Sequence, residues 1–159
     1  MRPLTLAKTA GAAFVTATVG GLASRPAASR WYASLKKPRF QPPRQVFPIV
    51  WPLLYADIAA VSASTVDHFQ SRNQPEKARA FTGLLAGNLL LNASWTWLFF
   101  TRRQLGAAAL AAAALTASSA DLTRRAIEAR GAGGAPLGLY PLWCGFATLL
   151  SSRIWWLNR

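Results

Sequence analysis

Long intervals without charged residues, separated by short charged joints, set the pattern of this chain. Four intervals contain no Lys, Arg, Asp or Glu, namely residues 9–24, 80–101, 104–120 and 131–152. A fifth, residues 45–71, holds only Asp57 and, near its end, Asp67 and His68. A membrane-spanning helix needs about 20 mostly apolar residues. We therefore predict five transmembrane helices in a single all-α integral membrane domain over residues 1–159, at about residues 4–23, 46–68, 79–101, 104–127 and 134–157.

The first apolar interval also allows a second interpretation, a cleavable signal peptide. Arg2 and Lys8 precede the apolar stretch, and Ala23 and Ser24 would suit a cleavage site. The stretch is long for the core of a signal peptide, and the other four spans require a membrane in either case. We favour a retained helix, and the sequence leaves the alternative open.

Composition and charge placement support a membrane protein and argue against a nucleic-acid partner. The chain is 52% hydrophobic and only 14% charged, whereas a soluble domain has roughly a quarter of its residues charged. The formal net charge of +13 comes from Lys and Arg in the joints between the predicted helices, where such residues meet lipid headgroups. Six of them lie in the first loop, so we expect this loop and the C-terminus to be cytoplasmic. The alanine- and arginine-rich composition suggests a bacterial cell membrane.

Conventional catalytic chemistry is absent from the sequence. Cys144 is the only cysteine and His68 the only histidine, so neither a zinc site nor a Cys/His nucleophile pair can be assembled. The five acidic residues show no useful pairing, and there is no glycine-rich phosphate loop. We predict no catalytic residues, no metal and no required cofactor, and we favour a binding protein over an enzyme.

Aromatic and amide side chains recur at helical spacing on three of the predicted helices. Residues three or four apart share one helix face, and a side-chain amide should turn away from lipid tails towards the bundle interior. Such faces suit a flat, largely apolar ligand with polar edges. The residues concerned are Trp51 and Tyr55; Asn88, Asn92 and Trp95; and Tyr140, Trp143 and Ala147.

Two further features call for an explanation. Residues 31–55, WYASLKKPRFQPPRQVFPIVWPLLY, contain five of the ten prolines, and Pro48 and Pro52 should kink or splay the start of the second helix. Asp57 follows within the same predicted span, where a carboxylate is costly unless neutral, paired or hydrated. It is either a protonated structural acid or a pocket group.

These motifs closely resemble the translocator protein family, also called tryptophan-rich sensory proteins or peripheral-type benzodiazepine receptors. The similarity covers roughly residues 8–158. It rests on the proline- and tryptophan-rich segment 31–55, on Leu91-Asn92-x-x-Trp95-x-x-x-Phe99-Phe100 and on Tyr140-x-x-Trp143-x-x-x-Ala147. The chain departs from the family pattern at Phe40, where a tryptophan is usual, and at Asn88, where a glutamine is usual.

The resemblance implies a five-helix bundle in which the first loop, residues 24–45, forms a proline-rich lid over an internal pocket. It further implies binding of porphyrins such as protoporphyrin IX, or of another flat apolar molecule, and a homodimer in the lipid bilayer. The small-residue motif Gly83-x-x-x-Gly87 would lie in the dimer seam. The implied pocket residues are Tyr32, Pro42, Trp51, Tyr55, Asn88, Asn92, Trp95, Trp143 and Ala147.

The leading hypothesis is therefore a membrane receptor or sensor for porphyrins and related tetrapyrroles, with coupling to their transport or degradation as further outputs. Two alternatives stay open: a small transporter of an amphipathic solute, and an enzyme that degrades the bound porphyrin.

Overall fold

The computed structural model describes residues 2–25 and 29–159, and all regular secondary structure within these residues is helical. This confirms the predicted class, a bundle of five long helices. The long helices are α1 (Pro3–Ala23), α3 (Phe47–Ser71), α4 (Pro75–Thr96), α5 (Leu105–Arg130) and α6 (Leu139–Leu157). The short elements are α2 (Arg30–Ser34), η2 (Arg44–Val46), η3 (Trp97–Thr101) and η4 (Gly131–Gly138).

Proline and left-handed residues set the ends of the long helices. α1, α3 and α4 each have a proline in the first turn, where its missing N–H has no intrahelical partner to lose. The chain then turns through residues with positive φ after α3, η3 and α5, namely Asn73, Arg103 and Gly131. These turns make the successive helices α3 to α6 run antiparallel.

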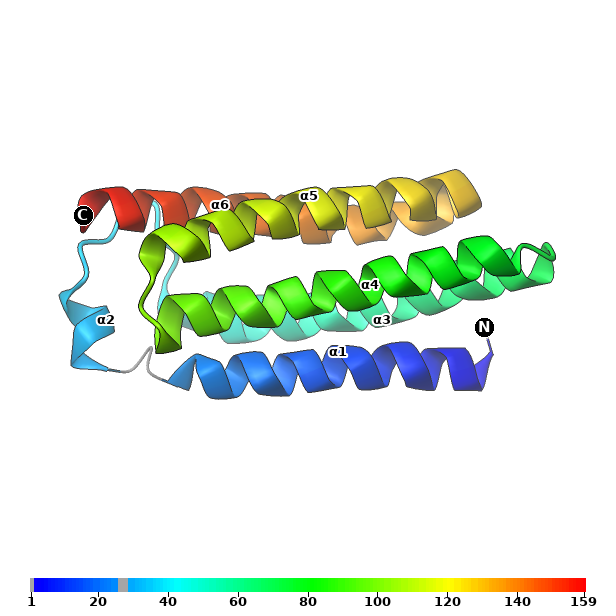
Figure 1. Cartoon of the computed structure of the whole chain (residues 1–159), viewed down its shortest axis with the longest axis horizontal. Helices are drawn as coiled ribbons and strands as arrows, with labels where there is room; N and C mark the ends of the chain where they lie inside the picture. The colour runs from blue at the N-terminus through cyan, green and yellow to red at the C-terminus, as the bar shows by residue number, and fades with distance from the viewer. Residues whose placement is uncertain (1, 26–28) are drawn as a thin grey trace.

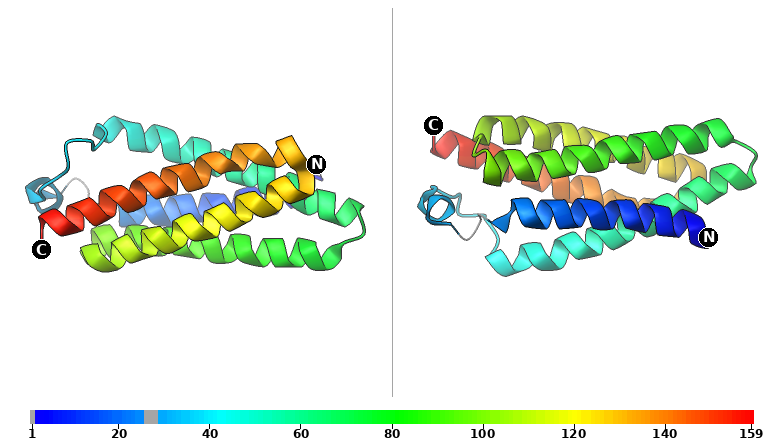
Figure 2. Two further views of the ribbon diagram at one scale, coloured as in Figure 1. Left: turned by 90° about the horizontal axis from the view of Figure 1, so that it is seen from above. Right: turned by 60° about the horizontal axis from the view of Figure 1, so that its bottom comes forward.

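The helices form an elongated bundle whose two ends differ (Figure 1). α1 packs on α3 and α4, whereas α5 packs between α4 and α6. We call the end that holds α2, the η3–α5 turn and the C-terminus the lid end, and the end that holds the N-terminus and the α3–α4 turn the distal end. α3 has few contacts with α6 and splays away from the other helices towards the lid end (Figure 2).

Three stretches are long and apolar enough to be candidate membrane spans: Pro3–Ala23, Arg44–Ser71 and Leu105–Leu157. The third contains both α5 and α6, which lie antiparallel and side by side (Figure 1), so it would cross the membrane twice. α4 is not among the candidates. Glu76, Lys77 and Arg79 in its first turns and its two asparagines make it more polar, but α4 lies against α1, α3 and α5 along the bundle.

The loop between α1 and α3 lies at the lid end and is fastened to the end of α6. The Lys36 N–H donates to Asn158 Oδ1 at 2.9 Å, and Asn158 Nδ2 donates back to the Lys36 carbonyl at 2.9 Å. Lys37 Nζ donates to the Tyr32 carbonyl at 2.6 Å, which ties the loop to α2. Of the predicted lid, residues 26–28 lie outside the described part of the chain.

One glycine in η4 is required by close packing, which generates a first prediction. A Cβ at Gly134 would collide with the backbone carbonyl of Ala126 on α5, so η4 and α5 would have to separate. We expect Gly134→Ala to lower the free energy of unfolding by about 1–3 kcal/mol, the usual cost of overpacking. Thermal unfolding in detergent measures this.

Gly133→Ala is the matched control, because a Cβ there meets only the flexible side chain of Arg130. Equal melting temperatures for the two variants would contradict the proposed contact.

Candidate functional site

A cavity of about 600 Å³ opens between α1, α3, α4 and α6 at the lid end. Its volume falls within the roughly 300–1,000 Å³ of typical small-molecule sites. On α1 it extends from Arg25 inwards to Ala17, and on α4 and η3 from Phe100 inwards to Asn92. We call it the lid-end cavity. It forms where α3 diverges from α6, and the glycines of α1, Gly20 and Gly21, leave room beside it.

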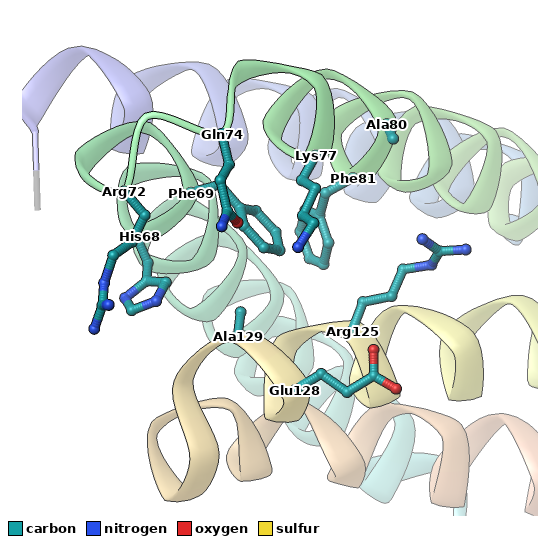
Figure 3. Close-up of a pocket in the computed structure, with 10 residues that line it drawn as sticks. All are labelled: His68, Phe69, Arg72, Gln74, Lys77, Ala80, Phe81, Arg125, Glu128 and Ala129. Atoms are coloured by element: carbon teal, nitrogen blue, oxygen red, sulfur yellow. The ribbon is translucent and has the colours of Figure 1, made fainter.

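A second cavity, of about 400 Å³, lies at the distal end between the α3–α4 turn and the last turns of α5 (Figure 3). We call it the distal cavity. Its lining includes four groups that carry or can carry positive charge, His68, Arg72, Lys77 and Arg125. It shares no lining residue with the lid-end cavity.

Aromatic rings form the walls of the lid-end cavity. Trp51 stacks on Tyr55, with ring centroids 5.6 Å apart and planes 29° apart. The ring centroids of Trp51 on α3 and Trp95 on α4 lie 6.1 Å apart with their planes tilted by 36°, so the two helices contribute adjoining rings to the wall. Trp95 is held in place by its indole N–H, which donates to Ser151 Oγ on α6 at 3.2 Å. Trp51, Tyr55 and Trp95 thus form one continuous aromatic wall shared by α3 and α4.

A π-helical turn adds two more rings to this wall. η3 closes with a bond from the Arg102 N–H to the Trp97 carbonyl. The wider π turn shifts the register of a helix by one residue and is frequent at functional sites. Phe99 and Phe100 are neighbours in sequence, yet both line the cavity. A regular α-helix would point adjacent side chains about 100° apart.

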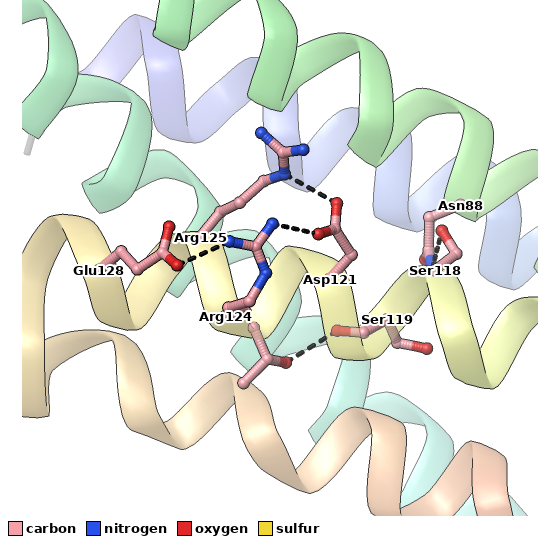
Figure 4. A network of polar contacts seen from close by, with 8 residues as sticks. Asn88, Ser118, Ser119, Asp121, Arg124, Arg125 and Glu128 are labelled. Atoms are coloured by element: carbon pink, nitrogen blue, oxygen red, sulfur yellow. Dashed lines mark hydrogen bonds and ion pairs between the residues drawn. The ribbon is translucent and has the colours of Figure 1, made fainter.

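The inner end of the cavity is closed by a chain of hydrogen bonds that joins four helices. Tyr55 Oη donates to Asn92 Oδ1 at 2.8 Å, and Asn92 Nδ2 donates to Tyr140 Oη at 3.0 Å. Tyr140 Oη then donates to Asn88 Oδ1 at 2.8 Å, and Asn88 Nδ2 donates to Ser118 Oγ at 3.1 Å, as Figure 4 shows for the last pair. From Tyr55 to Asn88, each residue donates a hydrogen bond to the next. The two buried amides therefore have hydrogen-bond partners inside the bundle.

Two arginines line the lid-end cavity near its outer end. Arg25 follows α1, and Arg44 begins η2, just before α3. The Arg44 guanidinium carbon lies 5.6 Å from the centre of the Tyr32 ring, and Lys37 Nζ lies 4.6 Å from the same ring. Burial raises the pKa of the Tyr32 hydroxyl, and burial followed by repulsion from Arg44 lowers the pKa of Lys37. Positive charge therefore gathers where the cavity meets the lid.

The structure brings together five of the nine predicted pocket residues. The five that line the lid-end cavity are Tyr32, Trp51, Tyr55, Asn92 and Trp95. The other four lie elsewhere. Asn88 is buried deeper in the hydrogen-bond chain, Ala147 is buried in α6, and Pro42 is half-buried in the loop.

Trp143, the last of the four, supports the cavity wall from behind. Its ring meets that of Trp51 edge-on at 6.4 Å. It also lines a shallow groove between α3 and α6 together with Asp57. Asp57 Oδ2 and Trp143 Nε1 are buried and lack a hydrogen-bond partner in the described part of the chain. Asp57 is therefore placed outside the lid-end cavity.

Sequence reasoning missed the two arginines, Phe100 of η3 and Ser151 as residues that line the cavity. Arg25 and Arg44 looked like ordinary loop cations, and nothing in the local pattern separates them from their neighbours. Phe99 follows Trp95 by four residues and so shares its helix face in the sequence, but the π turn that also brings Phe100 to the cavity is not visible in helical periodicity. No group of three or more His, Cys, Asp or Glu that could hold a metal ion occurs among residues 2–25 and 29–159.

Comparison with known proteins bears on this architecture directly. The sequence model of the TspO/MBR family matches residues 9–157, nearly the whole chain. The chain belongs to the TspO/MBR family. It is 38% identical to the translocator protein of Bos taurus over 132 residues, which cover 82% of this chain and 76% of the bovine one.

Bacterial proteins match as well. Protein CrtK of Rhodobacter capsulatus is 30% identical over 128 residues, 80% of this chain and 78% of CrtK. The tryptophan-rich sensory protein of Cereibacter sphaeroides is 36% identical over 78 residues, 49% of this chain and 45% of its own. The family resemblance predicted from the sequence motifs is thus confirmed.

The hydrogen-bond chain generates a second prediction. Tyr140→Phe removes the hydroxyl that links the two asparagines and leaves a buried acceptor and a buried donor unpaired. An unsatisfied buried polar group costs about 1–3 kcal/mol, so we expect the melting temperature in detergent to fall by several degrees.

Tyr32→Phe is the control, since the Tyr32 hydroxyl accepts one bond, from Gln41 in the loop. An equal loss of stability in both variants would show that the Tyr140 hydroxyl has no special part in joining the helices.

Proposed function

We propose that this TspO/MBR protein is a membrane receptor that binds a porphyrin in the lid-end cavity. The observation that carries the proposal is the combination of aromatic walls with two arginines at the outer end of one cavity. A porphyrin such as protoporphyrin IX matches this arrangement, because its flat apolar macrocycle suits the aromatic walls and the carboxylates on one edge suit the arginines.

The walls favour a flat ligand. Stacked or edge-on aromatic contacts contribute roughly 0.5–1.5 kcal/mol beyond the burial of apolar area. Trp51 and Trp95 present such surfaces from two different helices. Trp95 is oriented by its bond to Ser151, so little ordering of this wall would be required on binding.

The charges favour one orientation of the ligand. Arg25 and Arg44 lie at the outer end, whereas the inner end is lined by Tyr55 and Asn92, which already bond to each other. Carboxylates would therefore meet the arginines in charge-assisted hydrogen bonds, and the macrocycle would lie inwards.

Binding and sensing are favoured over transport through the bundle. Between the hydrogen-bond chain and the distal end, the interior is packed with buried side chains of the main core cluster, including Ile58, Phe81 and Leu85. A solute that passed from the lid end to the distal end would have to separate these contacts. Directional flux of porphyrin in proteoliposomes would instead support the transporter alternative.

The test is a titration of detergent-purified protein with protoporphyrin IX, followed by quenching of tryptophan fluorescence. We expect Trp51→Ala to weaken binding about fivefold, because it removes a stacking wall worth about 1 kcal/mol. Trp156→Ala is the control, since Trp156 is exposed on α6 and does not line the cavity.

The same titration tests the orientation with a second ligand. Arg44→Gln should weaken binding of protoporphyrin IX but leave binding of its dimethyl ester unchanged, because the ester has no carboxylate. Unchanged affinity of Trp51→Ala for the acid would contradict a porphyrin in this cavity.

We further propose that the protein forms a homodimer through the Gly83/Gly87 strip of α4. Both glycines have open space where a Cβ would lie, so this strip faces away from the bundle. Small residues let helices approach closely in lipid, where apolar burial contributes little to association.

For this reason Gly83→Leu with Gly87→Leu should produce monomers, as read by cross-linking in membranes or by light scattering. Porphyrin quenching should persist, because the strip does not line the lid-end cavity. A dimer that survives both substitutions would move the seam to another surface.

A further inference from the structure

The distal cavity carries an inference that is independent of the porphyrin proposal. Arg72, Lys77 and Arg125 all line this cavity; the Lys77 side chain points between the helices, and the guanidinium groups of Arg72 and Arg125 lie on opposite sides of it (Figure 3). Its acidic lining residue is Glu128. The cavity therefore combines an excess of positive charge with a partly apolar wall.

The acids near this end neutralise only part of that charge. Glu128 is engaged by Arg124 at 2.6 Å, and Asp121 is shared between Arg124 at 2.6 Å and Arg125 at 2.7 Å (Figure 4). These pairs lie along the α5 surface, and they use only Nε of Arg125. Within the described chain, neither Arg72 nor Lys77 has an ion-pair or side-chain hydrogen-bond partner.

The position of Lys77 adds to the excess of positive charge in the distal cavity. It lies in the first turn of α4 beside one acid, Glu76, which is paired with Arg79, and no side chain caps that helix end at Gln74. A helix N-terminus carries partial positive charge, so a cation there is unfavourable and an anion favourable. A bound anion would relieve the repulsion between Lys77 and the helix end.

The apolar part of the lining favours an amphiphile over a simple ion. Phe69 and Phe81 are buried, and their rings lie 6.3 Å apart. The cavity lies at the end of a membrane bundle, next to the α3–α4 turn, where apolar helices give way to charged residues. This is the level at which lipid headgroups meet a membrane protein.

We propose that the distal cavity binds the phosphate headgroup of an anionic phospholipid. The phosphate meets Lys77, with the unpaired Arg72 on one side and Arg125 on the other, and the glycerol and first acyl carbons lie on the side of Phe69 and Phe81. The volume of about 400 Å³ is sufficient for a headgroup but not for a whole lipid, so the acyl chains continue into the bilayer.

The experiment measures binding of short-chain lipids to the protein in a neutral detergent by native mass spectrometry and calorimetry. The probes are dioctanoyl phosphatidic acid, dioctanoyl phosphatidylcholine and glycerol 1-phosphate. We expect phosphatidic acid to bind tightest. Lys77→Gln should weaken it about fivefold, and Arg72→Gln with Lys77→Gln more than tenfold, since each cation near a lipid phosphate contributes a similar amount.

Arg79→Gln is the matched control. Arg79 is an exposed cation near Lys77 on α4, but it pairs with Glu76 at 3.2 Å and does not line the cavity. We expect the affinity of the Arg79→Gln variant for phosphatidic acid to stay within about twofold of that of the wild type. Arg72 and Lys77 are exposed and unpaired in the described chain, so their substitution should not lower the melting temperature.

Three results would overturn the proposal. Equal weakening by Arg79→Gln and Lys77→Gln would indicate a diffuse effect of surface charge. Equal affinity for phosphatidylcholine and phosphatidic acid would show that the cavity does not recognise an anionic headgroup. Glycerol 1-phosphate binding as tightly as phosphatidic acid would assign the cavity to a soluble phosphate compound instead.

Discussion

The hydrogen-bond chain from Tyr55 to Ser118 is the constraint on which the rest of this structure depends. In a bilayer, a side-chain amide must find partners within the protein, because no water is present to replace them. Asn92 and Asn88 meet this demand through Tyr140, and in doing so they join α3, α4, α6 and α5. The chain therefore fixes how α4 is rotated in the bundle. That rotation turns Trp95 towards the cavity and leaves the Gly83/Gly87 strip on the outside.

The lid-end cavity exists because packing is tight on one side of this chain and loose on the other. Towards the distal end, core side chains fill the space between the helices. Towards the lid end, α3 diverges over a stretch that includes Pro48 and Pro52, and both prolines line the cavity. Proline removes backbone hydrogen bonds and bends a helix. The same local chemistry that weakens the start of α3 thus creates the room for a ligand.

The sequence was sufficient to predict the five helices and one face of the site, for physical reasons that also set its limit. Charge-free intervals are a direct consequence of burial in lipid, so helix number follows from them. Spacings of three and four residues placed Trp51, Tyr55, Asn92 and Trp95 on common faces, and all four line the cavity. Periodicity predicts which face of a helix a residue occupies, but not how deep in the bundle the residue lies or which residue of another helix it contacts.

Two kinds of residue illustrate this limit: a predicted pocket residue that lies outside the cavity, and cavity residues that were not predicted. Asn88 shares a face with Asn92 but lies one turn deeper, where Tyr140 and Ser118 occupy its amide. Arg25 and Arg44 come from the ends of two different helices, and only the fold brings both to one cavity. The same excess of 18 basic over five acidic residues means that most cations must find anions outside the chain. Where those cations adjoin buried aromatic rings, as at both ends of this bundle, the anion best suited to them carries an apolar body.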